Sequence, residues 1–97
     1  MPDPEQMLRV VISGRVQGVW FRGWTVAQAQ SLGLQGWVRN LSDGNVEAVF
    51  AGAKADVAVM QASCHQGPPA AQVRSVAVEP WLGPVPAGFQ QWATERC

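Results

Sequence analysis

Two glycines and an arginine in the segment GRVQGVWFR, residues 14–22, form the pattern most suited to binding chemistry in this chain. Gly14 and Gly18 follow the strand-forming run of residues 10–12 and lie four residues apart. A strand that turns through such glycines into a helix can point consecutive backbone N–H groups into one space, where the helix start adds a positive dipole end. Arg22 falls in the first helical turn, where a bound dianion would offset its unfavourable interaction with the dipole. The segment predicts an anion site, and a plain turn with a solvated Arg22 fits the same residues equally well.

The charges of the chain favour a small anion over a nucleic acid as the ligand. The net charge is zero, yet residues 7–40 contain four arginines and no acidic residue. Arginine suits an anion site because its planar guanidinium can donate two parallel hydrogen bonds to the oxygens of a phosphate. A nucleic-acid-binding domain would instead carry a net basic excess. We therefore expect a small-molecule ligand and no nucleic acid, and we expect inorganic phosphate or sulfate to fit the loop.

Other site chemistries lack the residues that they need. His65 is the only histidine, and no CxxC or HxxxH spacing occurs, so we expect no metal and no cofactor. Two cysteines, Cys64 and Cys97, are too few for a disulfide framework. A cysteine phosphatase needs an arginine six residues after its nucleophile, where this chain has Ala70. Catalysis by a Ser/His/Asp or Cys/His set would depend on His65 alone, and we interpret Cys64 and His65 as structural.

Length and composition predict one soluble domain over residues 1–97, with residues 1–6 frayed. The chain has 47% hydrophobic and 14% charged residues, an ordinary globular composition. No apolar run approaches the ~20 residues of a membrane span, and the acidic, proline-containing start differs from an export signal. We therefore expect a cytoplasmic monomer that does not contact a membrane.

The first predicted strand and helix flank the glycine loop. Residues 7–13 are apolar and β-branched and predict a central strand. After the loop, Gly33 can end a helix in the left-handed conformation. The apolar positions of that helix recur at helical spacing and are Phe21, Thr25, Ala29 and Leu32.

A hairpin and a second helix follow. Residues 36–41 and 46–51 predict two strands, and Asp43-Gly44 between them is a tight-turn signal because glycine adopts a positive φ without strain. The second helix ends at Gly67, which two prolines follow. Its apolar stripe consists of Ala53, Val57, Met60 and Cys64.

The last part of the chain predicts one further strand and leaves another open. Residues 71–79 read as a strand, although Val73 differs in parity from Val76, which indicates a bulge or a later start. Residues 87–94 allow a short fifth strand at the sheet edge. The order β-α-β-β-α-β predicts an α+β, ferredoxin-like fold, with an antiparallel sheet and two helices on one face.

Two segments resemble the signatures of the acylphosphatase family. Residues 14–22 resemble the first, which is a glycine, a variable residue, Val-Gln-Gly-Val, a variable residue and Phe-Arg. Residues 36–52, GWVRNLSDGNVEAVFAG, are similar to the second, and the similarity continues through residues 66–76. The resemblance covers about residues 7–80, and two long ungapped segments in the right order identify the family. The matching positions of the second segment are Gly36, Val38, Asn40, Gly44, Val46 and Gly52.

The resemblance implies an enzyme, an acylphosphatase that hydrolyses the carboxyl–phosphate bond of small acyl phosphates without a metal or a covalent enzyme intermediate. It implies that Arg22 binds the phosphate and that Asn40 orients the attacking water. No pattern in the sequence would have selected Asn40 on its own. The backbone implied to bind the phosphate is that of Arg15, Val16, Gln17, Gly18, Val19 and Trp20.

Three alternatives share the predicted order of elements. An RNA-binding module would carry exposed aromatic residues in a set motif on its third strand, and residues 45–51 lack that motif. A non-catalytic anion-sensing domain would not need Arg22 and Asn40 together. A detached domain of the kind that begins larger hydrogenase-maturation proteins shares both signatures and stays an alternative.

Other cationic and aromatic residues near the loop have structural interpretations. We interpret the side chains of Arg15 and Arg39 as solvated or paired surface cations rather than additional ligands. Large aromatic residues beside a loop pack more often than they bind. We expect packing roles for Trp20, Trp24 and Trp37, which could also line the mouth of a site.

Overall fold

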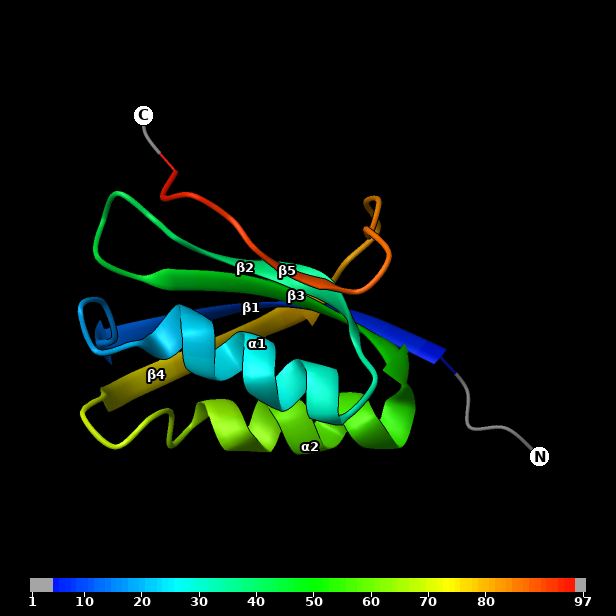
Figure 1. Cartoon of the computed structure of the whole chain (residues 1–97), viewed down its shortest axis with the longest axis horizontal. Helices are drawn as coiled ribbons and strands as arrows, with labels where there is room; N and C mark the ends of the chain where they lie inside the picture. Colours follow the sequence, from blue (N-terminus) through cyan, green and yellow to red (C-terminus); the bar gives the residue numbers. More distant parts are fainter. Residues whose placement is uncertain (1–4, 96–97) are drawn as a thin grey trace.

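A computed structural model describes residues 5–95 as a five-stranded sheet with two helices (Figure 1). The elements follow the expected order, with one additional strand at the end. They are β1 (Glu5–Arg15), α1 (Phe21–Ser31), β2 (Gln35–Asn40), β3 (Val46–Ala53), α2 (Lys54–Cys64), β4 (Gln72–Pro80) and β5 (Phe89–Gln91).

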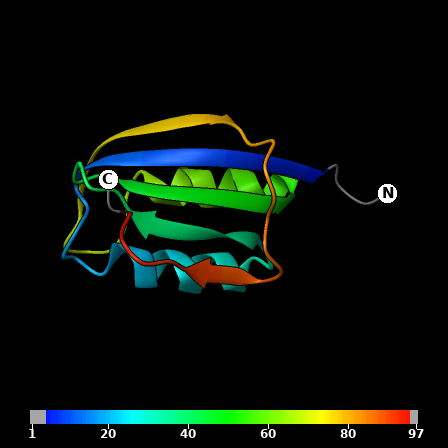
Figure 2. The same cartoon turned by 90° about the horizontal axis from the view of Figure 1, so that it is seen from above.

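The sheet has the strand order β4-β1-β3-β2-β5. The first four strands pair antiparallel, whereas β5 runs parallel to β2. Both helices lie on one side of the sheet, as the two views show together (Figures 1 and 2). α1 packs on β2 and β5, and α2 packs on β1 and β3. The predicted ferredoxin-like α+β fold is confirmed, and the open question of a fifth strand is answered by β5.

The core lies between the helices and the inner face of the sheet. The helices bury the expected apolar stripes, namely Phe21, Thr25 and Ala29 from α1 and Val57, Met60 and Cys64 from α2. Leu32 and Ala53, expected within the helices, lie just beyond them. Burial raises the pKa of the Cys64 thiol to about 12, so Cys64 stays a neutral core residue, as expected.

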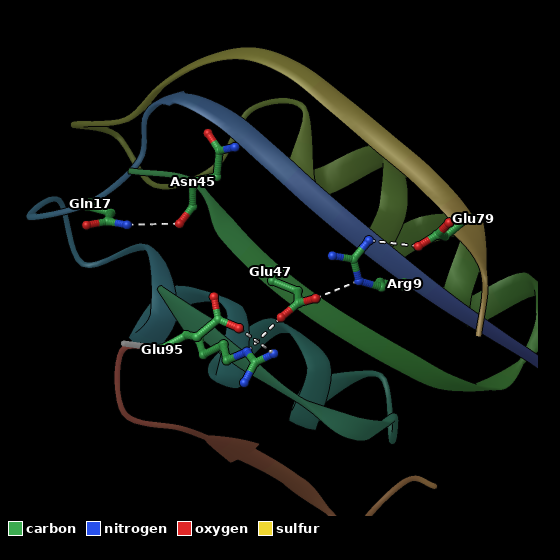
Figure 3. Close-up of polar contacts among 7 residues, drawn as sticks. Arg9, Gln17, Asn45, Glu47, Glu79 and Glu95 are labelled. Atoms are coloured by element: carbon green, nitrogen blue, oxygen red, sulfur yellow. Dashed lines mark hydrogen bonds and ion pairs between the residues drawn. The ribbon is translucent and has the colours of Figure 1, made fainter. Parts of the chain in front are cut away.

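Five charged residues form an ion-pair chain across the opposite face of the sheet. Glu47, only 4% exposed, accepts hydrogen bonds from Arg9 and, at 2.6 Å, from Arg39. Arg9 also contacts Glu79 at 2.7 Å, as Figure 3 shows, and Arg39 contacts Glu95 at 3.4 Å. Burial lowers the pKa of Arg9, but hydrogen bonds and charge interactions with both glutamates outweigh it and raise the pKa overall. Arg39 is therefore a paired cation, as predicted.

A β-bulge explains the change of parity in β4. Ser13 pairs with Ser75 and Gly14 pairs with Val73, so Arg74 is the extra residue. Gly14 has φ +121°, and a Cβ there would lie 2.2 Å from the carbonyl oxygen of Gln72. Only glycine therefore fits where β1 passes the bulge and enters the loop.

Residues 5 and 6 are more ordered than expected. Glu5 and Gln6 pair with Ala53 and Gly52 of β3, so they belong to β1 and are not frayed. The prediction was wrong because β3 extends to Ala53 and offers backbone partners that the sequence of the start does not reveal. The rest of the expected frayed segment, residues 1–4, lies outside the described residues, as does Cys97. Within residues 5–95, no helix is long and apolar enough to span a membrane.

Candidate active site

A cavity of about 210 Å³ lies where the β1–α1 loop meets the end of β2 and β5. It brings together the two residues expected to be catalytic, Arg22 and Asn40, with part of the expected binding loop. The residues that line it are Val16, Gly18, Trp20, Phe21, Arg22, Gly23, Asn40 and Gln91. Three other residues of the expected set, Arg15, Gln17 and Val19, do not line it.

The backbone of the loop leaves its amide groups available. Gly18 has φ +73° and Trp20 has φ +66°, so two left-handed residues alternate with right-handed or extended neighbours. Such alternation forms anion-binding concavities from backbone N–H groups. Within the described part of the chain, no backbone N–H of residues 16–20 donates to a backbone carbonyl. These donors precede the free N–H groups of the first turn of α1, where the helix dipole favours an anion.

Arg22 is held at the cavity by the last segment of the chain. One of its terminal nitrogens, Nη1, donates to the backbone carbonyl of Trp92 over 3.1 Å. The ion pairs among residues 5–95 use other arginines, Arg9 and Arg39, so no described carboxylate neutralises Arg22. The guanidinium is thus fixed on one side and keeps further donors for a ligand.

Asn40 reaches the same cavity from the end of β2. Its backbone carbonyl accepts a hydrogen bond from the N–H of Glu95 over 2.9 Å, and the N–H of Trp92 donates to Val38 over 2.8 Å. The segment after β5 therefore continues along β2 and contacts the backbone of Asn40 as well as the side chain of Arg22. This arrangement fixes the position of the two residues relative to each other.

The side chain of Gln17 connects the loop to the β2–β3 turn. Its Nε2 donates to the carbonyl of Leu41 over 2.8 Å and to that of Asn45 over 2.9 Å. Figure 3 shows the contact with Asn45. Because Leu41 follows Asn40 directly, this side chain couples the position of the loop to that of Asn40.

Gly23 and Gln91 line the cavity, although the sequence analysis did not name them. Gly23 directly follows the Phe-Arg end of the first signature, and this position could have indicated that it lies at the site. Gln91 had no such indication, because its place depends on the pairing of β5 with β2.

Arg22 is the only charged residue among the described residues that line the cavity, and no histidine or cysteine lines it. Three or more metal-ligating side chains do not cluster anywhere within residues 5–95. The site can therefore bind and orient an anion and a water molecule, but its lining offers no general base, no side-chain nucleophile and no His, Cys, Asp or Glu metal ligand.

Comparisons with known proteins agree on one family. The family model described as Acylphosphatase matches residues 8–91. An acylphosphatase of Rhodospirillum rubrum is 55% identical over 84 residues, which cover 87% of this chain and 92% of the relative. A solved acylphosphatase structure from Coxiella burnetii is 36% identical, with a TM-score of 0.86 over 91% of this chain and 93% of that one. Full-length HypF is similar in fold only, at 24% identity and TM-score 0.86, over 97% of this chain and 13% of HypF.

Replacement of Gln17 tests its positioning role. Gln17→Ala removes two hydrogen bonds of ~0.5–1.5 kcal/mol each, so a looser loop should weaken binding of inorganic phosphate about tenfold. Titration calorimetry measures the dissociation constant. Gln66→Ala, at an exposed glutamine after α2, is the matched control and should bind as the unaltered chain does. Equal affinity in both variants would show that the loop keeps its shape without Gln17.

Proposed function

Since the chain belongs to the acylphosphatase family, we propose that this cavity hydrolyses the carboxyl–phosphate bond of small acyl phosphates. Water attacks phosphorus, the bond from phosphorus to the carboxyl oxygen breaks, and the products are a carboxylate, inorganic phosphate and a proton. The observation that carries the proposal is the convergence of Arg22, Asn40 and the amide-rich loop on one cavity.

The phosphoryl group binds to backbone donors and one guanidinium. The N–H groups of the loop residues that line the cavity, Val16, Gly18 and Trp20, and those at the start of α1 bind the negative oxygens, and Arg22 donates through the N–H groups that do not contact Trp92. Phosphoryl transfer spreads charge over the equatorial oxygens of the transferred group, so fixed donors that meet this charge lower the barrier. The positions of these donors, set before binding, require no reorganisation during the reaction.

Asn40 orients the attacking water. Its side-chain carbonyl accepts a hydrogen bond from water and fixes the line of attack, whereas a neutral amide cannot remove a proton. No other residue of the lining can act as a base. The proton of the water therefore passes to an oxygen of the substrate's own phosphoryl group.

A carboxylate is a good leaving group and needs no strong general acid. This matches a cavity whose lining contains no carboxyl or imidazole group. A phosphate monoester expels an alkoxide or phenoxide, which is more basic and requires protonation or a metal. The residues present therefore suit an anhydride and not an ester.

The proposal includes a cytoplasmic monomer that binds a freely diffusing substrate. The cavity is formed within a single chain by the β1–α1 loop, α1, β2 and β5. The substrate is a small anion, which does not cross a membrane unaided.

The substrate class is tested by release of phosphate from benzoyl phosphate and from phenyl phosphate, which expels a basic phenoxide, each with a chelator present. We expect turnover of benzoyl phosphate alone, at a rate that the chelator leaves unchanged. His65→Ala, which alters an exposed residue outside the cavity, should retain this activity. Phosphate binding without any turnover would instead indicate a non-catalytic anion sensor.

Replacement of Arg22 by lysine tests the two-pronged contact with phosphate. A lysine keeps the charge but loses the paired donors, and charge-assisted hydrogen bonds are worth ~1.5–3 kcal/mol each. Both Arg22→Lys and Arg22→Ala should therefore lower kcat/KM at least about 100-fold. Arg74→Lys, at an exposed arginine of β4, is the control. A lysine variant with most of its activity would refute the bidentate role, provided that thermal unfolding shows an intact fold.

Replacement of Asn40 separates binding from chemistry. Asn40→Ala should leave the affinity for inorganic phosphate within about threefold and lower kcat at least about 100-fold, because only the water loses its partner. Asn45→Ala removes an amide whose hydrogen bond is local to the turn and serves as the control. A parallel loss of phosphate binding and of kcat would make Asn40 a binding residue.

A further inference from the structure

Trp20 lies at the rim of the cavity in an unfavourable setting. It is 67% exposed, although it is one of the largest apolar residues of the chain. It is also the one non-glycine residue within residues 5–95 that has a positive φ, with φ 66° and ψ 26° at the start of α1. Bulky residues rarely adopt this left-handed conformation, and such outliers concentrate at functional sites.

Gly23 provides the surface against which the indole of Trp20 rests. A Cβ at Gly23 would lie 2.1 Å from Nε1 and 2.6 Å from Cε2 of that indole. Glycine within a helix is less favourable than alanine, and the backbone at Gly23 has no positive φ that requires it. The absent side chain at Gly23 therefore leaves room for the indole, whose five-membered ring lies against the first turn of α1.

The other tryptophans are explained by packing, and Trp20 is not. Trp24 makes an edge contact with Phe21 at 5.3 Å between ring centroids. Trp37 stacks on Trp92 at 4.4 Å and meets the edge of Trp81 at 6.0 Å. Among the described residues, Trp20 alone of the tryptophans has no aromatic partner, and it borders the cavity instead.

On the premise of the acylphosphatase activity above, we propose that Trp20 determines the acyl group that the site accepts. Its indole binds planar aromatic acyl groups by stacking while the phosphoryl end occupies the loop. The site therefore prefers aromatic acyl phosphates such as benzoyl phosphate to acetyl phosphate, whose methyl group cannot stack. Trp20 thus has a role beyond its backbone N–H, which belongs to the phosphate-binding loop.

The test compares kcat/KM for benzoyl phosphate and acetyl phosphate in the unaltered chain and in three variants. The unaltered chain should favour benzoyl phosphate, and Trp20→Gly should reduce that preference about fivefold, which corresponds to ~1 kcal/mol. Most of the change should fall on KM for benzoyl phosphate. Trp20→Phe, which keeps a ring, should retain the preference within about twofold. Gly23→Ala displaces the indole and should lower the preference as Trp20→Gly does.

Two further measurements keep the outcome decisive. Glycine adopts a positive φ without strain, so Trp20→Gly should unfold at the same or a higher temperature, which excludes a folding defect. Phenylphosphonate and methylphosphonate test the binding preference without any turnover, and their ratio of dissociation constants should change in the same direction. If the unaltered chain hydrolyses neither acyl phosphate but Trp20→Gly changes the ratio of the two phosphonate dissociation constants, the proposed function is overturned and the role of Trp20 is not. An unchanged preference in Trp20→Gly, in both assays, would overturn the role of Trp20 alone.

Discussion

The site depends on one constraint on the backbone between β1 and α1, which must turn from strand to helix without pairing its own N–H groups. Gly14 makes the turn feasible at the bulge beside β4, and the left-handed residues Gly18 and Trp20 keep the loop from closing into an ordinary hydrogen-bonded turn. Left-handed backbone at a residue such as Trp20 costs about 1–3 kcal/mol. Other contacts must offset this cost, and the buried side chains of Val16 and Phe21 anchor both ends of the loop in the core. The unpaired donors gain their partners from solvent or from an anion.

The ion pairs and stacked rings on the open face of the sheet support the same site from the other side. The chain returns along β2 after β5, where the stacking of Trp92 on Trp37 and the pairing of Glu95 with Arg39 hold it. That return places the carbonyl of Trp92 against Arg22. A surface ion pair contributes little by itself, but Glu47 is buried between two arginines and links three strands. The position of the guanidinium therefore depends on residues that never line the cavity.

Features that depend on neighbouring residues could be predicted from the sequence, and features that depend on distant pairing could not. The helix end at Gly33, the turn at Gly44 and the bulge signalled by Val73 are local, and each is present. The hydrogen bond from Arg22 to the carbonyl of Trp92 joins residues that are 70 positions apart, and no sequence pattern in either segment indicates it. The resemblance to a family supplied Asn40. Its place near the loop follows from Val46 of β3, which pairs with Asn40 on one side and with Ile12, near the end of β1, on the other. Glu5 and Gln6 were misjudged for the same reason, because their order comes from pairing with the far end of β3.

The distribution of charge explains why so simple a cavity can be selective. Arg9 and Arg39 are neutralised by glutamates on the open face, so their fields reach the cavity weakly, whereas Arg22 has no described carboxylate partner. One unneutralised guanidinium beside a loop of free amides attracts a dianion strongly and a neutral molecule little. The same lining offers nothing that could protonate a departing oxygen. Under the proposed function, binding alone would not distinguish one phosphorylated molecule from another. The reaction would distinguish them, because only a phosphoryl group attached to a weakly basic leaving group reacts under positioning and electrostatic stabilisation alone.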